Sequence, residues 1–315
     1  KKLTTSKWQK KLSYIKDLSE FVKKAVHVAY QGTKNSSAGT RMAAQLLAKE
    51  LKVSYYEWDI DQVLKNYTEL IEQQVQRKLT WEADDLSLQN IQARTRSPGI
   101  WLLANLKNAL LLSTSNRSEA AVGYATMDGD TSGGLSPIAG VDKDFLNKWI
   151  RWCAEQGPEG FAPIASLKEV YKKPPTAELR PLSAHQEDEK DLMPYEVLEK
   201  IEREFIRERK SPLDVTESVM GHFPQISEKV IAGYVIKFLR LWSRNQWKRE
   251  RYAPVFHLDD ESLDPKTWCR YPILMASFDE EAFTSAARAV FVASTSVLAF
   301  VRAVWAVVSS AAAAA

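Results

Sequence analysis

Residues 113–143 read STSNRSEAAVGYATMDGDTSGGLSPIAGVDK, and they decide how the rest of the chain is interpreted. The run ALLL directly before them is short and apolar, and it ends in small polar residues. Such a run is typical of a buried parallel strand whose carboxyl end opens into a loop, so we expect a strand over 109–114. Ligands bind beyond the carboxyl ends of strands in open parallel sheets. Thr114 and the following loop are therefore expected where chemistry occurs.

The residues after this strand combine several polar groups. They predict a helix that bears Glu119, followed by a loop with Asp128, Asp130 and three glycines. This layout can bring a hydroxyl, a carboxylate and the lysine at 143 around one phosphate-bearing ligand, and carboxylates there could hold Mg²⁺. The alternative is that the glycines form an ordinary turn and the acids are solvated, because glycine-rich loops are common. Spacing alone leaves both interpretations open.

The segments before residue 109 alternate between helix and strand patterns. Apolar residues at helical spacing predict a helix over 18–30, and Ser36 or Ser37 is expected to cap a second helix. The apolar face of this second helix is Met42, Leu46, Leu47 and Leu51. A strand over 53–60, a helix over about 62–78, and a helix over 86–107 with a kink or restart at Pro98-Gly99 complete the first part.

The second half of the chain is mainly helical. A helix is expected near 142–156, residues 157–191 are loop-rich, and residues 194–250 read as helices, the longest starting near Ser227. Because helix and strand alternate through the first half, the predicted class is α/β.

Composition narrows the class of protein. The chain has 315 residues, is 45% hydrophobic and 26% charged, and carries a formal charge of +3, which fits one large or two modest domains and gives no sign of a general nucleic-acid binder. Cys153 and Cys269 cannot build a disulfide scaffold, so a reducing, cytosolic setting fits best. The first five residues are polar, without a signal-peptide pattern.

The last part of the chain has an unusual composition. Residues 284–315 are rich in alanine and valine, and Arg288 and Arg302 interrupt the apolar stretch before it reaches the roughly 20 residues that cross a bilayer. We expect an amphipathic or interface-packed helix rather than a membrane contact. The closing alanines, 311–315, could also be a tag.

Four separated motifs resemble one family. They are NIQARTR at 90–96, the stretch 113–143, YKKPPTAEL at 171–179 and NQWKR at 245–249. In this order they resemble the synthetase domain of the glutamine-dependent NAD(+) synthetases, over about 30–281. The resemblance implies an adenine-nucleotide α-hydrolase-like fold, with a parallel sheet flanked by helices and a helical C-terminal extension. Residues 1–281 would form this domain, with 194–281 as its helical part and 282–315 as a tail of uncertain origin.

The resemblance also implies a reaction. ATP would adenylate the nicotinate carboxylate of deamido-NAD, and ammonia would then displace AMP to give NAD. By motif, Thr114 and Lys143 would contact ATP, Thr176 would lie near its phosphates, and Glu119 would hold Mg²⁺ or substrate. Deamido-NAD would lie along Asn90, Arg94, Asp130 and Lys248. Ammonia would come from a glutaminase domain of the same polypeptide in a cytoplasmic homo-oligomer, with no nucleic-acid or membrane partner.

The chain departs from the family pattern in several places. Met127 stands where ammonia-dependent members carry Lys, and Trp247 stands where they carry His. The phosphate loop of the form SGGxDS is absent, and the nearest string, at 132–136, lacks the Asp and runs into Pro137 instead of a helix. The glutaminase domain is also absent, so truncation is the favoured interpretation. The alternatives are a non-catalytic fragment or scaffold, or a related ligase acting on another carboxylate.

Other candidate sites have weaker support. His27, His185, His222 and His257 share no metal-ligand spacing, and Ser113 or Ser115 as a nucleophile would need a nearby His. The basic, aromatic run 242–252 could suggest nucleic acid, but a solvated helix end is the favoured interpretation.

Overall fold

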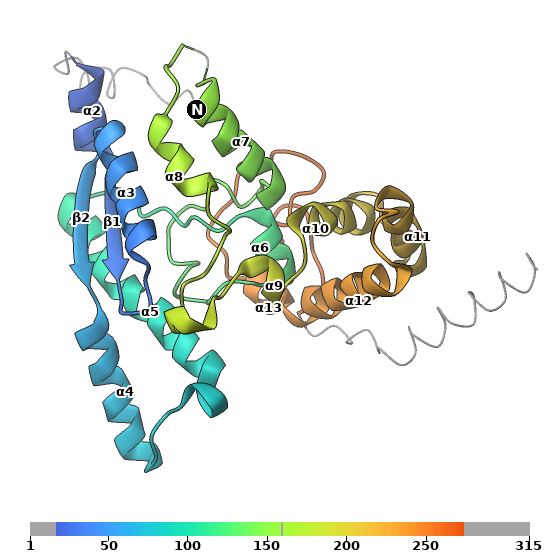
Figure 1. Ribbon diagram of the computed structural model, residues 1–315, viewed down its shortest axis with the longest axis horizontal. Helices are drawn as coiled ribbons and strands as arrows, with labels where there is room; N and C mark the ends of the chain where they lie inside the picture. The colour runs from blue at the N-terminus through green and yellow to red at the C-terminus, as the bar shows by residue number, and fades with distance from the viewer. Residues whose placement is uncertain (1–16, 159, 274–315) are drawn as a thin grey trace, which may run out of the picture.

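The computed structural model describes residues 17–158 and 160–273 (Figure 1). The predictions for the polar first residues and for the tail 284–315 lie outside these residues. The elements are, in chain order, α2 (Leu18–Ala25), β1 (His27–Gly32), α3 (Ala38–Glu50), β2 (Ser54–Asp59), α4 (Asp61–Val75), α5 (Trp81–Lys107), α6 (Arg117–Val122), α7 (Lys143–Glu155), η1 (Ala165–Leu167), α8 (Lys168–Tyr171), η2 (Leu182–Ala184), α9 (Asp188–Asp191), α10 (Tyr195–Glu202), η3 (Arg203–Arg207), α11 (Pro212–His222), α12 (Glu228–Arg244) and α13 (Gln246–Arg249).

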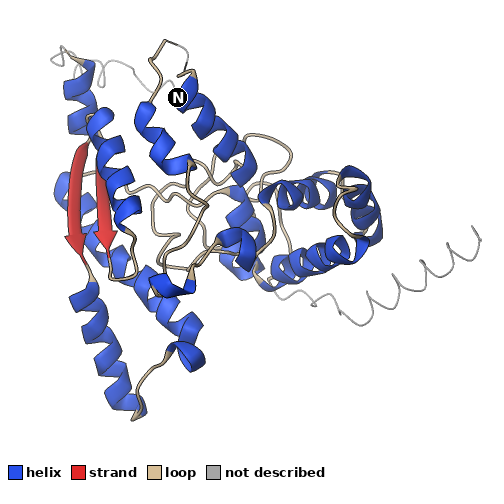
Figure 2. Ribbon diagram, viewed as in Figure 1, coloured by secondary structure: helices blue, strands red, loops and turns tan. Residues whose placement is uncertain are grey.

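The sheet of the described residues is parallel and lies between helices (Figure 2). β1 and β2 pair in parallel from His27 opposite Ser54 to Gly32 opposite Asp59, and α3 crosses over between them. Ser37 caps α3, because its hydroxyl accepts a hydrogen bond from the Thr40 amide. α5 packs against the sheet where a Cβ at Gly99 would lie 3.4 Å from Trp58. The predicted α/β class, a parallel sheet flanked by helices, is therefore confirmed.

The helix predicted over 18–30 is wrong in its second half. α2 ends at Ala25, Val26 is extended with φ −113° and ψ 118°, and β1 begins at His27. Val28 and Tyr30 favour strands, and the hydrogen bonds that hold them there come from β2, more than 20 residues further along the chain. The spacing of apolar residues within 18–30 is a local signal, so it cannot show that residues 27–32 pair with the distant strand β2.

The buried strand predicted over 109–114 is also wrong. Leu112 forms only an isolated parallel bridge with Leu135, in which the Ser113 amide donates to the Leu135 carbonyl at 2.9 Å. Leu110 and Leu112 are 63% and 49% exposed. The segment pairs along one side, and no other strand of the part of the chain that the structure describes covers it. The apolar composition of residues 109–112 therefore predicted a buried strand, but in the described fold Leu110 and Leu112 remain exposed.

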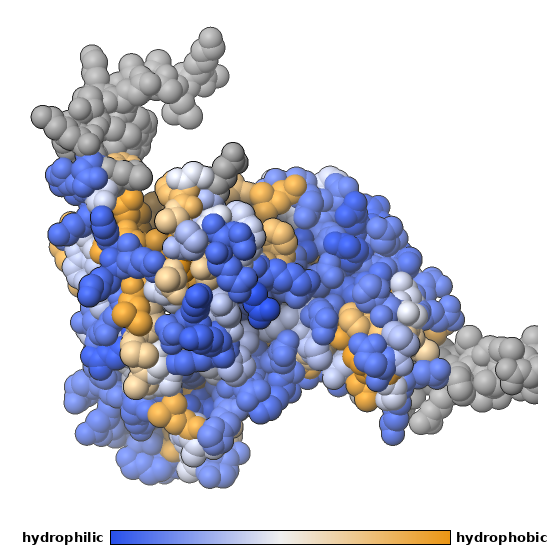
Figure 3. Space-filling view, turned by 45° about the horizontal axis from the view of Figure 1, so that its top comes forward, coloured by the Kyte–Doolittle hydropathy of each residue, from blue (hydrophilic) through white to orange (hydrophobic). Residues whose placement is uncertain are grey.

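Two helix details differ from the prediction. α5 continues through Pro98, and its one residue with non-helical dihedral angles is Asp84, so the helix does not restart at Pro98-Gly99. The missing proline N–H removes a single intrahelical bond, and the helix continues beyond it. In α3 the expected apolar face is largely exposed, and the helix buries Ala43 and Ala48 instead, because small side chains allow close packing. Figure 3 shows exposed hydrophobic residues gathered on the side of the molecule that holds the sheet.

The main hydrophobic core lies between α6 and the C-terminal helices α10, α11 and α12. Its largest members are almost fully buried and include Phe238, Leu239, Ile231 and Leu198. The predicted helices over 194–250 are confirmed, and α12 begins directly after Ser227. The expected solvated helix end at 242–252 is wrong, because Trp242 and Arg249 are buried with the guanidinium 3.9 Å from the centre of the indole ring system. Within residues 17–158 and 160–273, no helix combines the length and apolar character needed to cross a bilayer.

Candidate functional site

The first turn of α6 is held by a reciprocal cap. The Asn116 side chain accepts from the Glu119 amide at 3.0 Å, and the Glu119 carboxylate accepts from the Asn116 amide at 3.3 Å. This capping box explains why the sequence SNRSE starts a helix after the preceding loop. It also fixes the Glu119 side chain at the amino-terminal end of α6.

Glu119 meets Lys143 at the start of α7. The Lys143 Nζ lies 3.4 Å from Glu119 Oε1, and the two side chains are 22% and 19% exposed. The backbone N–H of Lys143 donates to the Ser118 hydroxyl at 3.1 Å, which ties the two helix starts together. Burial raises the pKa of Glu119, and Lys143 opposes that shift. The structure thus brings two predicted site residues together as a partly buried ion pair.

A second carboxylate lies in the field of this pair. Asp188, at the start of α9, is buried, and burial raises its pKa while Lys143 lowers it. Tyr195 donates to Asp188 Oδ2 at 3.2 Å, and Asp188 Oδ1 has no hydrogen-bond partner within the described residues. A buried oxygen without a donor is suited to a cation. Sequence reasoning missed Asp188, which sits in an acidic–basic run that resembles an ordinary solvated loop.

Three other predicted residues meet at one loop, residues 123–132, which we call the glycine loop. Asn90 accepts from the Thr126 hydroxyl at 3.0 Å, and Arg94 Nε donates to the Met127 carbonyl at 3.0 Å, both from α5. Lys248 approaches from α13, and its ammonium donates to two carbonyls of the same loop, at 2.7 Å and 2.9 Å. Asn90 and Arg94 therefore contact the same loop as Lys248, although more than 150 positions of the chain separate them from it.

Asp130 lies within the glycine loop. Its carboxylate accepts from the Thr126 amide at 2.7 Å, and its backbone carbonyl accepts from the Ser113 hydroxyl at 3.1 Å. The second contact brings the loop to the residue that precedes Thr114.

Tyr252 is a buried residue near this loop that the sequence did not point to. Burial is the main cause that raises the pKa of its phenol, and the negative charges of Glu119 and Asp130 raise this pKa further.

The two predicted threonines lie apart from these contacts. Thr114 is exposed. Thr176 is exposed too, and its hydroxyl accepts from the Glu178 amide at 3.2 Å. Glu178 in turn accepts from Thr40 at 2.7 Å, so Thr176 lies beside the start of α3. Within the part of the chain that the structure describes, neither threonine side chain hydrogen-bonds to Glu119, Lys143 or the glycine loop.

A buried amide pair fastens the 171–179 segment to α5. Asn35 donates to Gln92 Oε1 at 2.8 Å and to the Leu179 carbonyl at 3.1 Å. Gln92 donates to the Glu178 carbonyl at 3.2 Å. Both side chains are buried. The NIQARTR and KKPPTAEL motifs, which the sequence singled out separately, are thus in contact.

A buried arginine joins the starts of α6 and α7 to the C-terminal segment. Arg117 is 3% exposed and lies 2.7–3.4 Å from four carboxylates, those of Glu202, Glu261, Asp142 and Asp259. Burial raises the pKa of Glu202 to about 8. We call these five side chains the Arg117 cluster. Sequence reasoning missed it because its members are scattered over 145 positions.

The described residues contain no ready-made metal site of the kind that three protein ligands form. Within residues 17–158 and 160–273, no three or more His, Cys, Asp or Glu side chains are placed together so that they could hold a metal ion. Mg²⁺, however, usually binds through one or two carboxylates together with substrate phosphates. Glu119 and the unpartnered oxygen of Asp188 fit that requirement. The string at 132–136 is followed by turns, and the next helix begins only at Lys143, so it lacks the helix start of a phosphate loop.

The chain is similar to proteins of known function. A family model described as NAD synthase matches residues 19–251. The chain is 29% identical over 265 residues to a glutamine-dependent NAD(+) synthetase of Dictyostelium discoideum, and 32% identical over 226 residues to that of Aquifex aeolicus. These alignments cover 79% and 72% of this chain and 36% of each relative. The crystal structure of a glutamine-dependent NAD(+) synthetase from Cytophaga hutchinsonii matches 82% of this chain and 40% of that chain, with a TM-score of 0.72 and 44% identity. The chain therefore spans just over a third of the curated relatives it matches.

Proposed function

The chain belongs to the NAD synthase family, and on that premise we propose that it forms the unit that adenylates deamido-NAD with ATP and amidates it with ammonia. The products are NAD, AMP and pyrophosphate. The observation that carries the proposal is the Glu119–Lys143 pair beside a glycine loop that Asn90, Arg94 and Lys248 all contact. This arrangement supplies cations and a carboxylate where a nucleotide and a dinucleotide have to meet.

Adenylation is the step that Lys143 serves. The ammonium binds the phosphates of ATP, Thr114 contributes its hydroxyl, and Thr176 contacts the phosphates from the 171–179 segment. Glu119 and Asp188 would hold Mg²⁺, which would offset the negative charge of the phosphates. The nicotinate carboxylate attacks the α-phosphorus, and pyrophosphate leaves. Both partners need close positioning more than an acid–base pair, which agrees with a site built of fixed charges.

Deamido-NAD lies along the glycine loop. Arg94 uses only its Nε on the Met127 carbonyl, and its two terminal nitrogens have no partner among the described residues, so they are free for a diphosphate. The Lys248 ammonium has three N–H donors, and two of them bind carbonyl oxygens of the glycine loop. Asn90 and Asp130 complete the contacts. Ammonia then attacks the acyl adenylate, and the C–O bond to AMP breaks.

Ammonia supply, assembly and compartment are parts of the same proposal. The relatives are named glutamine-dependent, so we infer that glutamine supplies the ammonia through a glutaminase domain. An exposed apolar stripe on α4, formed by Val63, Tyr67, Leu70 and Ile71, supports a homo-oligomer. The buried free thiols of Cys153 and Cys269 fit the reducing cytoplasm.

The rival is a scaffold that keeps the fold without the chemistry. Calorimetry of the chain with ATP and Mg²⁺ separates the two, because binding supports a working site and no heat supports the scaffold. Conversion of deamido-NAD to NAD is then measured with saturating ammonia, for this chain and for the longest product of its gene. No turnover in either would discard the enzymatic proposal.

A further inference from the structure

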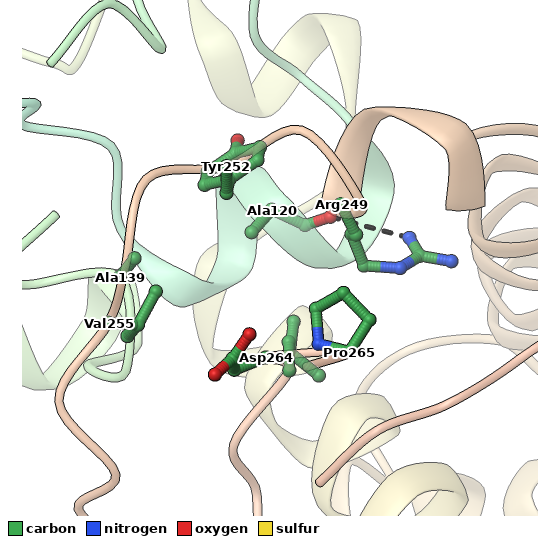
Figure 4. Close-up of a pocket in the computed structure, with 8 residues that line it drawn as sticks. Ala120, Ala139, Arg249, Tyr252, Val255, Asp264 and Pro265 are labelled. Carbon is green, nitrogen blue, oxygen red and sulfur yellow. Dashed lines mark hydrogen bonds between the residues drawn. The ribbon is translucent and has the colours of Figure 1, made fainter. Parts of the chain in front are cut away.

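Helix α13 and Asn245, which precedes it, contact one stretch of main chain that runs from the end of α6 into the glycine loop. Their side chains donate to successive carbonyl oxygens: Arg249 to Ala120 and Ala121 at 3.4 Å and 2.8 Å, Asn245 to Val122 at 2.8 Å, and Lys248 to Gly123 and Ala125 at 2.7 Å and 2.9 Å. We call Asn245, Lys248 and Arg249 the carbonyl clamp. Figure 4 shows Arg249 reaching the Ala120 carbonyl beside Tyr252.

The clamp replaces donors that α6 lacks. The last carbonyls of a helix have no intrahelical partner, and buried carbonyls need one. Arg249 and Asn245 are buried, and Arg249 forms no ion pair within the described residues. Burial lowers the pKa of Arg249 to about 10. The buried Arg249 guanidinium donates its hydrogen bonds to carbonyl oxygens and pairs with no carboxylate among the described residues. Its role is therefore to hold the backbone in place and not to neutralise a negative charge.

Gly123 is the point where clamp and loop touch most closely. It is the left-handed C-cap of α6, with φ +67°, and a Cβ there would come within 2.4 Å of the Asn245 Cβ. The glycine is therefore required both by its dihedral angles and by the neighbouring side chain. The direction in which the glycine loop leaves α6 depends on Asn245.

α5 holds the other side of the loop. A Cβ at Gly129 would lie 2.9 Å from the Ala93 carbonyl carbon, so the loop backbone packs directly on this helix. The hydroxyls of Ser97 and Ser132 are 2.6 Å apart. The glycine loop, with Asp130 inside it, is thus held between α5 and the clamp. The Glu119–Lys143 pair lies at the other end of α6, where the Arg117 cluster joins the helix starts.

We propose that Asn245 and Arg249 are positioning residues, which hold the glycine loop so that Asp130 and the remaining N–H of Lys248 face the dinucleotide. This inference rests on the proposed function, because it takes the dinucleotide to be deamido-NAD. The clamp acts on the carboxyl-terminal end of α6, whereas the ATP contacts lie at its amino-terminal end. Loss of the clamp therefore weakens binding of deamido-NAD and leaves binding of ATP nearly unchanged.

The test uses Asn245→Asp in the full chain. The substitution keeps the side-chain shape but turns an oxygen toward the Val122 carbonyl in place of the donating N–H. We expect hydrogen–deuterium exchange of the amides of residues 124–132 to become at least tenfold faster, with exchange in α4 unchanged. By calorimetry, the Kd for deamido-NAD rises about tenfold, and the Kd for ATP with Mg²⁺ changes less than twofold.

Two further variants keep the test decisive. Gly123→Ala attacks the same contact from the loop side and should give the same split between the two ligands, also if Asn245→Asp folds poorly. Asn66→Asp makes the same substitution at an exposed position of α4 and should change neither affinity nor loop exchange.

Each outcome decides the inference. Unchanged loop exchange overturns the clamp, whether or not the chain binds deamido-NAD. Faster loop exchange with unchanged dinucleotide affinity overturns the positioning role, as does an equal loss of both ligands. If the unaltered chain binds no deamido-NAD, the proposed function fails with it, and loop exchange still shows separately whether the clamp exists.

Discussion

The Lys143 ammonium lies 3.4 Å from the Glu119 carboxylate, in an ion pair that is about four-fifths buried on both sides. Replacing the lysine by methionine leaves the carboxylate without its cation, and the pKa of Glu119, already raised by burial, rises further. We expect Lys143→Met to weaken ATP binding at least tenfold while the fold is retained. Calorimetry measures the affinity and circular dichroism the fold. Unaltered ATP affinity would remove Lys143 from the site.

Arg94 provides the matched experiment for the dinucleotide. Arg94→Gln removes the two terminal nitrogens that are free for a diphosphate, so we expect the Kd for deamido-NAD to rise roughly tenfold or more. The Kd for ATP should stay within a factor of two. Lys65→Gln, at an exposed position of α4, removes one charge elsewhere and serves as the control. Equal losses in Arg94→Gln and the control would point to net charge alone.

The pH dependence of stability should report Glu202. Burial raises its folded pKa to about 8, above the ordinary value near 4.5, and Asp142 and Glu261 add to the shift while Arg117 opposes it. Between these values the folded chain keeps a proton that the unfolded chain releases. The free energy of unfolding therefore falls as pH rises through this window, by up to about 1.4 kcal/mol per pH unit.

Glu202→Gln carries a neutral side chain of the same shape at every pH. Urea denaturation at pH 6 and pH 9 should show a smaller loss of stability for this variant than for the unaltered chain. Parallel pH curves for the two proteins would show that Glu202 is ionised throughout.

Arg117 should matter much more for stability than an exposed arginine. Arg117→Met removes the one buried cation that faces all four acids of the cluster, and Glu261 keeps only its half-exposed partners Arg203 and Arg207. We expect a cost of about 3–5 kcal/mol at neutral pH. The loss should shrink at acid pH, where the carboxylates take up protons. Arg77→Met breaks a surface pair with Asp84 and should lower stability far less than Arg117→Met. Similar urea midpoints for the two variants would contradict the central role of Arg117.

The apolar stripe on α4 predicts self-association. Leu70→Glu places a charge in the middle of the exposed residues Tyr67, Leu70 and Ile71, and should shift the protein to the monomer in light scattering after size-exclusion chromatography. Glu69→Gln, on the same helix, should not. A monomeric unaltered chain would rule out this assembly surface.

Local signals in the sequence were sufficient for most helices. A capping serine before α3, strand formers in β2 and helical periodicity in α4, α7 and α12 each act within a few residues, so these elements could be predicted. β1 could not be separated from α2, because its strand conformation depends on pairing with β2. The strand expected at 109–114 failed for the related reason that apolar composition does not reveal how many neighbours a segment has.

The candidate site divides in the same way. The family motifs led to Glu119, Lys143 and the residues that contact the glycine loop, although their roles stay predictions. The burial of Arg249 and the convergence on Arg117 were missed, because a basic run resembles a solvated helix end and dispersed acids carry no spacing signal. Long-range electrostatics of this kind emerges only once the chain is folded.

The Arg117 cluster determines how far toward the C-terminus a fragment has to extend in order to fold. The family match ends at residue 251, yet Glu261, the carboxylate nearest to Arg117, lies ten residues beyond that boundary. Lys266 also donates to the Tyr252 carbonyl at 2.8 Å. A recombinant fragment cut at residue 251, where the family match ends, would lose both contacts, and we expect it to be insoluble or readily digested by proteases. Expression trials should therefore keep the chain through at least residue 270.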